Sequence, residues 1–180
     1  MNKIDANKSL ILIIDVQEKL VNMLDEKNII KNSEILAKSA SILKVPTIIS
    51  EQYPKGLGET IKEIKETAKR AKYFEKTNFS ICEEEGFNEY LKNSGKNQII
   101  ILGIETHICV LQTGLDLLKN GYKVYIVEDA TSSRSTRNKD CALKRLMQAG
   151  TEIVTTEMVI FEWLKCSKNP NFKEIQALIK

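Results

Sequence analysis

The sequence predicts an α/β protein with an open parallel sheet and helices on both faces, a Rossmann-like three-layer arrangement. Short apolar runs alternate along the chain with longer segments of helical period. The runs at residues 10–14 (LILII) and 98–102 are apolar on both faces, as are strands in a covered parallel sheet. This alternation is typical of right-handed strand–helix–strand crossovers. No repeat, low-complexity tract or linker interrupts it, so we expect one domain over residues 1–180.

The segments that we expect to form strands are short and rich in β-branched residues. They are residues 10–14, 45–49, 98–102, 122–127 and the weaker run 151–155. Polar residues or glycine follow most of these runs directly, and Asp15 after the first run is an example.

The segments between them have the apolar spacing of helices. They are residues 29–44, 60–72, 83–93, 108–119, 139–149 and 172–180. In 108–119, Ile108, Leu111, Leu115 and Leu118 recur at steps of three and four and form one helical face. Gly150 follows the segment 139–149 as a good C-terminal cap.

Composition limits the classes of function. A chain of 180 residues can bury a substantial core, and its net charge of +3 is spread along the whole sequence. No basic tail or Arg-rich run occurs, so we expect no nucleic-acid partner. The polar N-terminus lacks the features of a signal peptide, and no apolar stretch approaches membrane-spanning length. We therefore expect a cytoplasmic protein that does not associate with a membrane.

The four cysteines are widely spaced, without a CxxC pair or a Cys/His cluster. This disfavours a structural zinc site or a thioredoxin-type centre. Most cysteines in a reducing compartment are small buried hydrophobes. Cys109 differs, because it follows a buried strand and Gly103 at the expected first turn of a helix. A thiol there ionises easily and a developing oxyanion can be held, so Cys109 is the candidate nucleophile.

In parallel sheets, ligands bind beyond the carboxyl ends of the strands, where the strand order reverses. Candidate site residues at those ends are Asp15, Gln17, Glu51, Gln52, Glu105, Cys109, Asp129 and residues 132–134. Asp15 has two interpretations of equal weight. It is either a strand-end carboxylate that caps the next helix, or a partly desolvated carboxylate that transfers a proton.

Lys76 lies in the segment YFEKTNF, where aromatic residues at 73, 74 and 79 favour a half-buried position. In a chain this rich in lysine, a single lysine is most often a solvated surface charge. A buried ammonium needs a carboxylate partner, and Asp15 is the candidate.

His107 is the only histidine and lies two positions before Cys109, too near to face the thiol across a cleft. We favour a turn or capping role for it over a papain-type Cys–His pair. One histidine also disfavours a catalytic zinc site, which usually has three protein ligands. The sequence contains no GxGxxG or Walker A motif. We therefore expect neither a metal nor a cofactor.

Three motifs together resemble the isochorismatase-like cysteine hydrolases, above all their short members of unassigned substrate. These motifs are Asp15 after the first strand, Lys76 in FEKTNFS and Cys109 in GIETHICV. The resemblance covers nearly the whole chain, including DATSSRS at residues 129–135. It implies a six-stranded parallel sheet with Asp15, Lys76 and Cys109 as the catalytic triad. It also implies a cis peptide at Ile104–Glu105, which directs the Glu105 N–H into an oxyanion hole together with the Cys109 N–H.

The resemblance further implies acyl transfer from a small amide or related C–N substrate through a covalent thioester. Nicotinamidase members bind a metal through an Asp-x-His and a further histidine after the second strand. This chain has Glu51-Gln52-Tyr53-Pro54 there, which disfavours that activity. Members that cleave isochorismate itself lack the cysteine that is present here as Cys109.

We expect the walls of the substrate pocket to include Gln17, Tyr53, Phe79 and Ser133, which suits a small, partly polar ligand. Family members often assemble, which implies a homo-oligomer. Residues 159–161 and Trp163 would then form either a subunit contact or ordinary core. Two other functions remain open. One is a non-catalytic binding or scaffold protein that retains the fold, and the other is a redox thiol protein with a second cysteine, such as Cys141, near Cys109.

Overall fold

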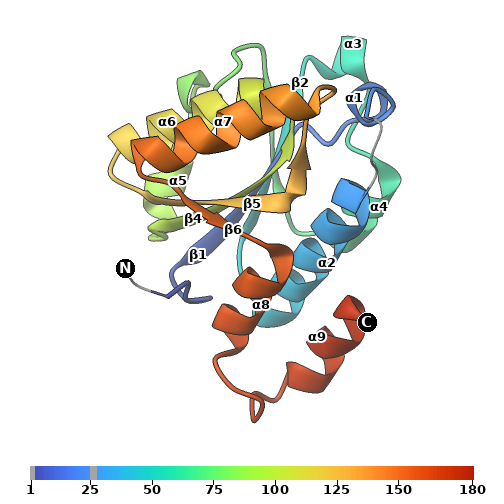
Figure 1. Ribbon diagram of the computed structural model, residues 1–180, viewed down its shortest axis with the longest axis vertical. Coiled ribbons are helices and arrows are strands. Elements are labelled where there is room, and N and C mark those ends of the chain that lie inside the picture. Colours follow the sequence, from blue (N-terminus) through green and yellow to red (C-terminus); the bar gives the residue numbers. More distant parts are fainter. Residues whose placement is uncertain (1–2, 25–27) are drawn as a thin grey trace.

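The computed structural model describes residues 3–24 and 28–180 and contains a six-stranded parallel sheet (Figure 1). The strand order is β3-β2-β1-β4-β5-β6. The strands are β1 (Ser9–Ile14), β2 (Thr47–Gln52), β3 (Lys72–Lys76), β4 (Gln98–Ile104), β5 (Lys123–Ser132) and β6 (Glu152–Val154). The predicted fold class, a single α/β domain with an open six-stranded parallel sheet, is confirmed.

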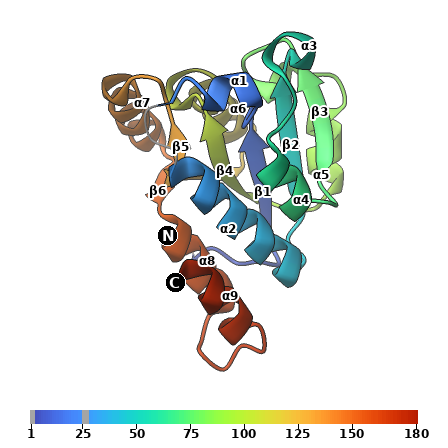
Figure 2. The same ribbon diagram turned by 90° about the vertical axis from the view of Figure 1, so that its right-hand side faces the viewer.

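Helices cover both faces of the sheet, and Figure 2 shows α2 and α4 crossing one of them. The helices are α1 (Glu18–Val21), α2 (Asn28–Leu43), α3 (Pro54–Leu57), α4 (Lys62–Thr67), α5 (Phe87–Asn93), α6 (Leu111–Lys119), α7 (Thr136–Ala149), α8 (Thr156–Leu164) and α9 (Phe172–Ile179). Helices α2, α4, α8 and α9 contribute to one hydrophobic core, and α5, α6 and α7 contribute to the other.

The central strands supply both cores because successive side chains point to opposite faces. In β1, Ile11 and Ile13 pack with α2, whereas Leu10, Leu12 and Ile14 pack with the opposite core. All six residues of β1 are buried, which explains why its sequence is apolar without alternation.

Two predicted elements differ from the structure between residues 60 and 93. The predicted helix 60–72 is only α4 (Lys62–Thr67), and β3 follows it as an edge strand that the sequence pattern did not indicate. In β3, only Lys76 is buried, so the strand lacks the apolar residues that identify the central strands. The predicted helix 83–93 begins at Phe87, after the 3₁₀ turn η1 (Ile81–Glu83).

Helix α8 also goes beyond the prediction, which assigned no helix between residues 155 and 165. Its first turn is capped by the Thr155 side chain, which accepts a hydrogen bond from the Met158 backbone N–H. Val159, Ile160 and Trp163 are buried within the chain's own core, and Phe161 is 44% exposed. Core packing therefore accounts for three of the four residues considered as a subunit contact.

The strand order reverses at β1. From β1 the chain adds β2 and β3 on one side, and it then adds β4, β5 and β6 on the other side. At the carboxyl ends of β1 and β4 the two backbones approach closely. A Cβ atom on Gly103 would lie 2.0 Å from the Ile14 carbonyl oxygen, and Gly103 has a φ of +126°. Glycine is therefore required where the strands bring Asp15 and the Cys109 turn together.

None of the helices within residues 3–24 and 28–180 has the length and apolar character needed to cross a membrane.

Candidate active site

Asp15, Lys76 and Cys109 meet at the reversal point of the sheet. Lys76 Nζ lies 2.8 Å from Asp15 Oδ2, and both side chains are fully buried. The Cys109 thiol is close enough to both groups for their charges to act on its pKa, which the carboxylate raises and the ammonium lowers. The three residues come from the end of β1, the end of β3 and the turn after β4. The structure thus brings together residues that lie far apart in the sequence.

Asp15 adopts a left-handed backbone conformation, with a φ of 52°, directly after β1. Aspartate tolerates this region better than most residues do. Its Oδ1 accepts a hydrogen bond of 2.7 Å from Ser50 Oγ at the end of β2. The contact between Oδ2 and Lys76 Nζ is an ion pair without hydrogen-bond geometry, although it is short. Oδ2 is therefore held by charge and has no hydrogen-bond donor among the residues that the structure describes.

Lys76 is the last residue of β3, and its ammonium is surrounded by oxygen atoms. It donates to Gln52 Oε1, to the Asn78 carbonyl at 3.3 Å and to the Phe79 carbonyl at 3.2 Å, besides pairing with Asp15. Such acceptors offset part of the cost of removing an ammonium from water. The predicted partnership of Lys76 with Asp15 is present, and the lysine is more deeply buried than expected.

Cys109 lies in the π-helical turn η2 (Thr106–Val110), which precedes α6. Burial, and after it the negative charge of Asp15, raises the pKa of its thiol to about 12, against the opposing effect of Lys76. The expectation of an easily ionised thiol is therefore wrong for the resting protein. The reason is where the thiol lies: Cys109 is only 7% exposed, and its thiol lies beside the carboxylate of Asp15. A protonated thiol of this kind needs a base before it can attack.

The peptide bond between Ile104 and Glu105 is cis, as the resemblance implied. It connects the end of β4 to η2. The Glu105 side chain is buried, and its Oε1 accepts a hydrogen bond of 3.0 Å from the Arg134 backbone N–H. The Arg134 side-chain Nε lies 3.6 Å from the same oxygen. This carboxylate therefore ties η2 to the segment that follows β5.

The residues predicted to line the substrate pocket have different environments. Tyr53 and Phe79 are 56% and 53% exposed, so their rings are available at the surface. Ser133 is buried, and its Oγ lies 3.0 Å from His107 Nδ1. The His107 contact links two segments near the thiol, in keeping with the turn role that we favoured for it.

Gln17 requires a correction, because its side chain has no exposed surface. Its Nε2 donates to the carbonyls of Gln52 and Gly58, and its Oε1 accepts from the Gln52 backbone N–H. The carboxamide is thus engaged with the backbone, and a direct contact between Gln17 and a substrate is not supported. The position of Gln17 in the sequence placed it correctly at the carboxyl edge of the sheet. It could not show that the Gln17 side chain binds the backbone of Gln52 and Gly58.

Two other strand-end carboxylates also have structural partners. Glu51 Oε1 accepts from the backbone N–H and the hydroxyl of Thr60, each at 2.7 Å. Asp129 Oδ1 accepts from the backbone N–H and the hydroxyl of Thr156 at the start of α8. Ser50 and Gln52 show the reverse, because they contact Asp15 and Lys76 directly. Gln52 was among the strand-end candidates, whereas Ser50 was not. Their only signal was their position at the end of β2.

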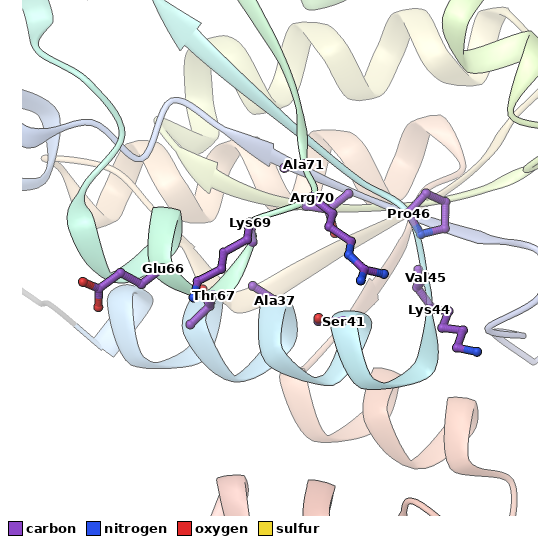
Figure 3. Close-up of a pocket in the computed structure, with 12 residues that line it drawn as sticks. Ala37, Ser41, Lys44, Val45, Pro46, Glu66, Thr67, Lys69, Arg70 and Ala71 are labelled. Atoms are coloured by element: carbon purple, nitrogen blue, oxygen red, sulfur yellow. The ribbon is translucent and has the colours of Figure 1, made fainter.

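A cavity of about 210 Å³ lies next to this cluster. It is lined by Tyr53, Pro54, Lys55, Glu75, Lys76, Thr77 and Glu84. A larger cavity of about 530 Å³ lies at the amino ends of β2 and β3, between α2 and α4 (Figure 3). Figure 3 shows Glu66 and Lys44 at opposite ends of it. Because ligands of parallel sheets bind at the carboxyl edge, the smaller cavity is the better candidate site.

Within residues 3–24 and 28–180, no three His, Cys, Asp or Glu side chains gather in a group that could hold a metal ion.

Comparisons with known proteins agree with the observed fold. The family model described as "Isochorismatase domain" matches residues 9–158. Isochorismatase family protein 1A of Dictyostelium discoideum is 41% identical over 184 residues, which cover 99% of this chain and 89% of that protein.

Two solved structures are similar over nearly the whole chain. The first, described as MAR1 ribonuclease from Caenorhabditis elegans, has a TM-score of 0.94 at 41% identity, with 99% of this chain and 92% of that chain covered. The second is the Escherichia coli YcaC gene product, described as an octameric hydrolase of unknown specificity. It has a TM-score of 0.93 at 27% identity, with 99% and 90% covered.

Proposed function

Because this chain belongs to the isochorismatase family, we propose that it is a cysteine-dependent hydrolase of a small amide or related C–N substrate. A hydrolase-like function follows from the family, and the cysteine mechanism is the proposal. The observation that carries it is the buried contact of the Cys109 thiol with the Asp15–Lys76 pair. A thiol, a base and a fixed positive charge are what acyl transfer through sulfur needs.

In the first half of the reaction, Asp15 Oδ2 accepts the thiol proton as the Cys109 sulfur attacks the substrate carbonyl carbon. The C=O π electrons move to oxygen and form an oxyanion. The backbone N–H groups of Glu105 and Cys109 stabilise this oxyanion. When the C=O bond re-forms, the C–N bond breaks, and the departing nitrogen takes the proton from Asp15. The product amine leaves, and the acyl group remains on sulfur as a thioester.

In the second half, Asp15 accepts a proton from water as the water oxygen attacks the thioester carbon. The C–S bond then breaks, and the sulfur takes the proton back from Asp15. The acid product leaves, and the enzyme returns to its starting state. Lys76 keeps its proton throughout and balances the charge that Asp15 and the sulfur share.

The substrate is small in this proposal. The cavity beside Lys76 has a volume of about 210 Å³, and pockets for drug-sized ligands are larger, about 300–1,000 Å³. Tyr53 lines this cavity with an exposed aromatic ring, Phe79 is exposed three residues after Lys76, and Ser133 supplies a hydroxyl near η2. Such walls suit a compact ligand with one polar and one apolar side.

The test is hydrolysis of a panel of small amides, measured as amine release, together with mass spectrometry of the protein during turnover. We expect Cys109→Ala to lose activity by a factor of at least about 10³, because the nucleophile is gone. Cys141→Ala, a change at an exposed cysteine, should retain full activity. A covalent mass increase on the Cys109 peptide should match the acyl group. Amide hydrolysis that survives Cys109→Ala would remove the assignment.

A second candidate function is RNA hydrolysis. It is favoured by one observation, the description of a 41% identical solved structure as a ribonuclease. The charge pattern of this chain gives it no further support, because the net charge is only +3. Adding RNA to the same panel discriminates the two candidates. Cleavage of RNA without amide turnover would favour the second.

A scaffold role is separated from catalysis by the same mass spectrometry. A non-catalytic scaffold should form no acyl adduct on Cys109 and release no amine, whatever the alkylation rates of the exposed cysteines Cys141 and Cys166. A redox role requires a disulfide partner, whereas all four cysteines are free in the structure. Free thiols also support our proposal of a reducing, cytoplasmic location. We further propose a homo-oligomer, which the octameric Escherichia coli relative supports.

A further inference from the structure

Gln52, the last residue of β2, connects two parts of the site through its side chain. Its Oε1 accepts a hydrogen bond from Lys76 Nζ. Its Nε2 donates a hydrogen bond of 2.8 Å to the Thr77 carbonyl oxygen. The carboxamide therefore holds both the ammonium of Lys76 and the backbone that follows it. Because β2 and β3 are paired with Gln52 opposite Lys76, the sheet register itself sets this contact.

The backbone of Gln52 is fixed in turn by Gln17. The Gln52 N–H donates to Gln17 Oε1 at 2.7 Å, and the Gln52 carbonyl accepts from Gln17 Nε2 at 3.0 Å. Gln17 also donates to the Gly58 carbonyl at 2.6 Å. A fully buried carboxamide with these bonds cannot be displaced without leaving buried polar groups without hydrogen-bond partners. Gln52 thus stands on a rigid support.

We propose that Gln52 is a positioning residue for the reaction, which holds the Lys76 ammonium against Asp15 and the Cys109 thiol. The catalytic part of this inference rests on the function proposed above. Gln17 acts indirectly, because it fixes the backbone of Gln52, and the Gln52 side chain in turn contacts Lys76.

The chemistry of the contact explains why an amide suits this position. An ammonium has three protons to donate, and the carbonyls of Asn78 and Phe79 accept at the longer distances of 3.3 and 3.2 Å. Gln52 adds an acceptor that carries no charge. A carboxylate in its place would compete with Asp15 for the ammonium and would oppose a negative charge on sulfur. A neutral oxygen holds the Lys76 ammonium in place without neutralising it, so its positive charge still acts on Asp15 and on the sulfur.

The test compares Gln52→Met, which keeps the length of the side chain but has no strong acceptor, with the wild-type protein. The control is Gln112→Met, at an exposed glutamine on α6. Two properties are measured, namely steady-state amide hydrolysis and the rate of Cys109 alkylation by iodoacetamide at pH 8 without substrate. We expect kcat to fall by about tenfold or more, with KM changed less than about twofold, because Gln52 orients a catalytic group and does not touch substrate.

Alkylation of Cys109 should also slow by about tenfold, since a displaced ammonium stabilises the thiolate less. Gln112→Met should leave both properties unchanged. A purely structural role for Gln52 would lower the melting temperature without changing the alkylation rate of the folded protein. If Gln52→Met alkylates at the wild-type rate and keeps its kcat, the inference is overturned.

A second variant, Gln52→Asn, keeps the amide but shortens the side chain by one methylene. Its oxygen falls short of Lys76, so we expect the same slow alkylation as in Gln52→Met, and it carries the test if Gln52→Met does not fold. Alkylation also separates the two proposals. If the wild type hydrolyses no amide, the proposed function fails, while the Cys109 rates still decide whether Gln52 positions Lys76.

Discussion

At the scale of single residues, the site has a protonated thiol beside an ion pair. Burial and the Asp15 charge raise the pKa of the Cys109 thiol to about 12, so at neutral pH the proton remains on sulfur. Asp15 consequently has two opposing effects. Its charge disfavours the thiolate, yet the function proposed above uses it as the base that removes the thiol proton.

These two effects predict opposite changes for Asp15→Asn. Removing the carboxylate charge lowers the pKa of the Cys109 thiol, so iodoacetamide should modify Cys109 severalfold faster at pH 8. Amide hydrolysis should fall by about 10²–10⁴-fold, because the base is lost. Peptide mass spectrometry and amine release measure the two rates. Asp140→Asn, on the exposed side of α7, is the matched control and should change neither. Slower alkylation in Asp15→Asn would contradict this account.

Gln17 and Cys109 show what the sequence can and cannot say about single residues. Position near the end of a buried strand was enough to select Asp15 and Cys109, and the aromatic residues around Lys76 made it a candidate partner of Asp15. The partners of Gln17 lie on residues 52 and 58, far along the chain, so no local pattern could show that its carboxamide is engaged. The pKa of a thiol depends on burial and on charges brought near by the fold, and sequence spacing does not contain these.

At the scale of elements, the close approach of β1 and β4 depends on Gly103. Replacing it with alanine would place a Cβ atom 2.0 Å from the Ile14 carbonyl oxygen at a φ of +126°. We expect Gly103→Ala to lower the free energy of unfolding by about 3 kcal/mol or more, measured by urea denaturation. The control is Gly121→Ala, where φ is +85° and no atom lies within 4 Å of the added Cβ. That change should cost only about 1 kcal/mol. Equal losses would exclude a steric cause.

Elements with a strong apolar signal were predicted well, and those without it were not. The segment 139–149 corresponds to α7, with Gly150 as its C-terminal cap. Edge strand β3 was missed because it needs only one buried residue, and that residue is a lysine. The π-helical turn η2 was predicted as the start of a regular helix, since its apolar spacing continues into α6 without a break.

At the scale of the whole molecule, two buried thiols connect stability to alkaline pH. Burial raises the pKa of both Cys82 and Cys109 from 9.0 to about 12. Below pH 9 both thiols are protonated in the folded and unfolded chains, so they contribute no pH dependence. Above pH 9 the unfolded chain releases these protons while the folded protein keeps them. The free energy of unfolding therefore falls as the pH rises from 9 towards 12.

Each thiol should contribute up to about 1.4 kcal/mol per pH unit in that range. Tyr73, Tyr122 and Tyr125 add to the same trend above pH 10, because burial raises their pKa values. Urea denaturation at pH 7, 9 and 10 measures the loss. Cys82→Ala should show a shallower decline than the wild type because one of the two thiols is absent. Parallel declines in the two proteins would show that Cys82 is not the source.

The global arrangement was the most predictable level, since alternating strands and helices allow few topologies. The strand segments that we identified from the residues correspond to β1, β2, β4, β5 and β6, and we expected them to be parallel, as they are. The sixth strand came from the resemblance alone. The order of strands places β1 between β2 and β4, and this explains why polar residues at several strand ends share one site.

Strand β3 has one neighbour, β2, and presents its other side to solvent. Edge elements with few buried residues detach first in local opening events, at a lower free energy than unfolding of the whole domain. Lys76 is carried by this strand, so fraying of β3 would withdraw the ammonium while β1 and β4 stay intact. Catalytic competence would then be lost at a temperature or urea concentration below that at which the core melts.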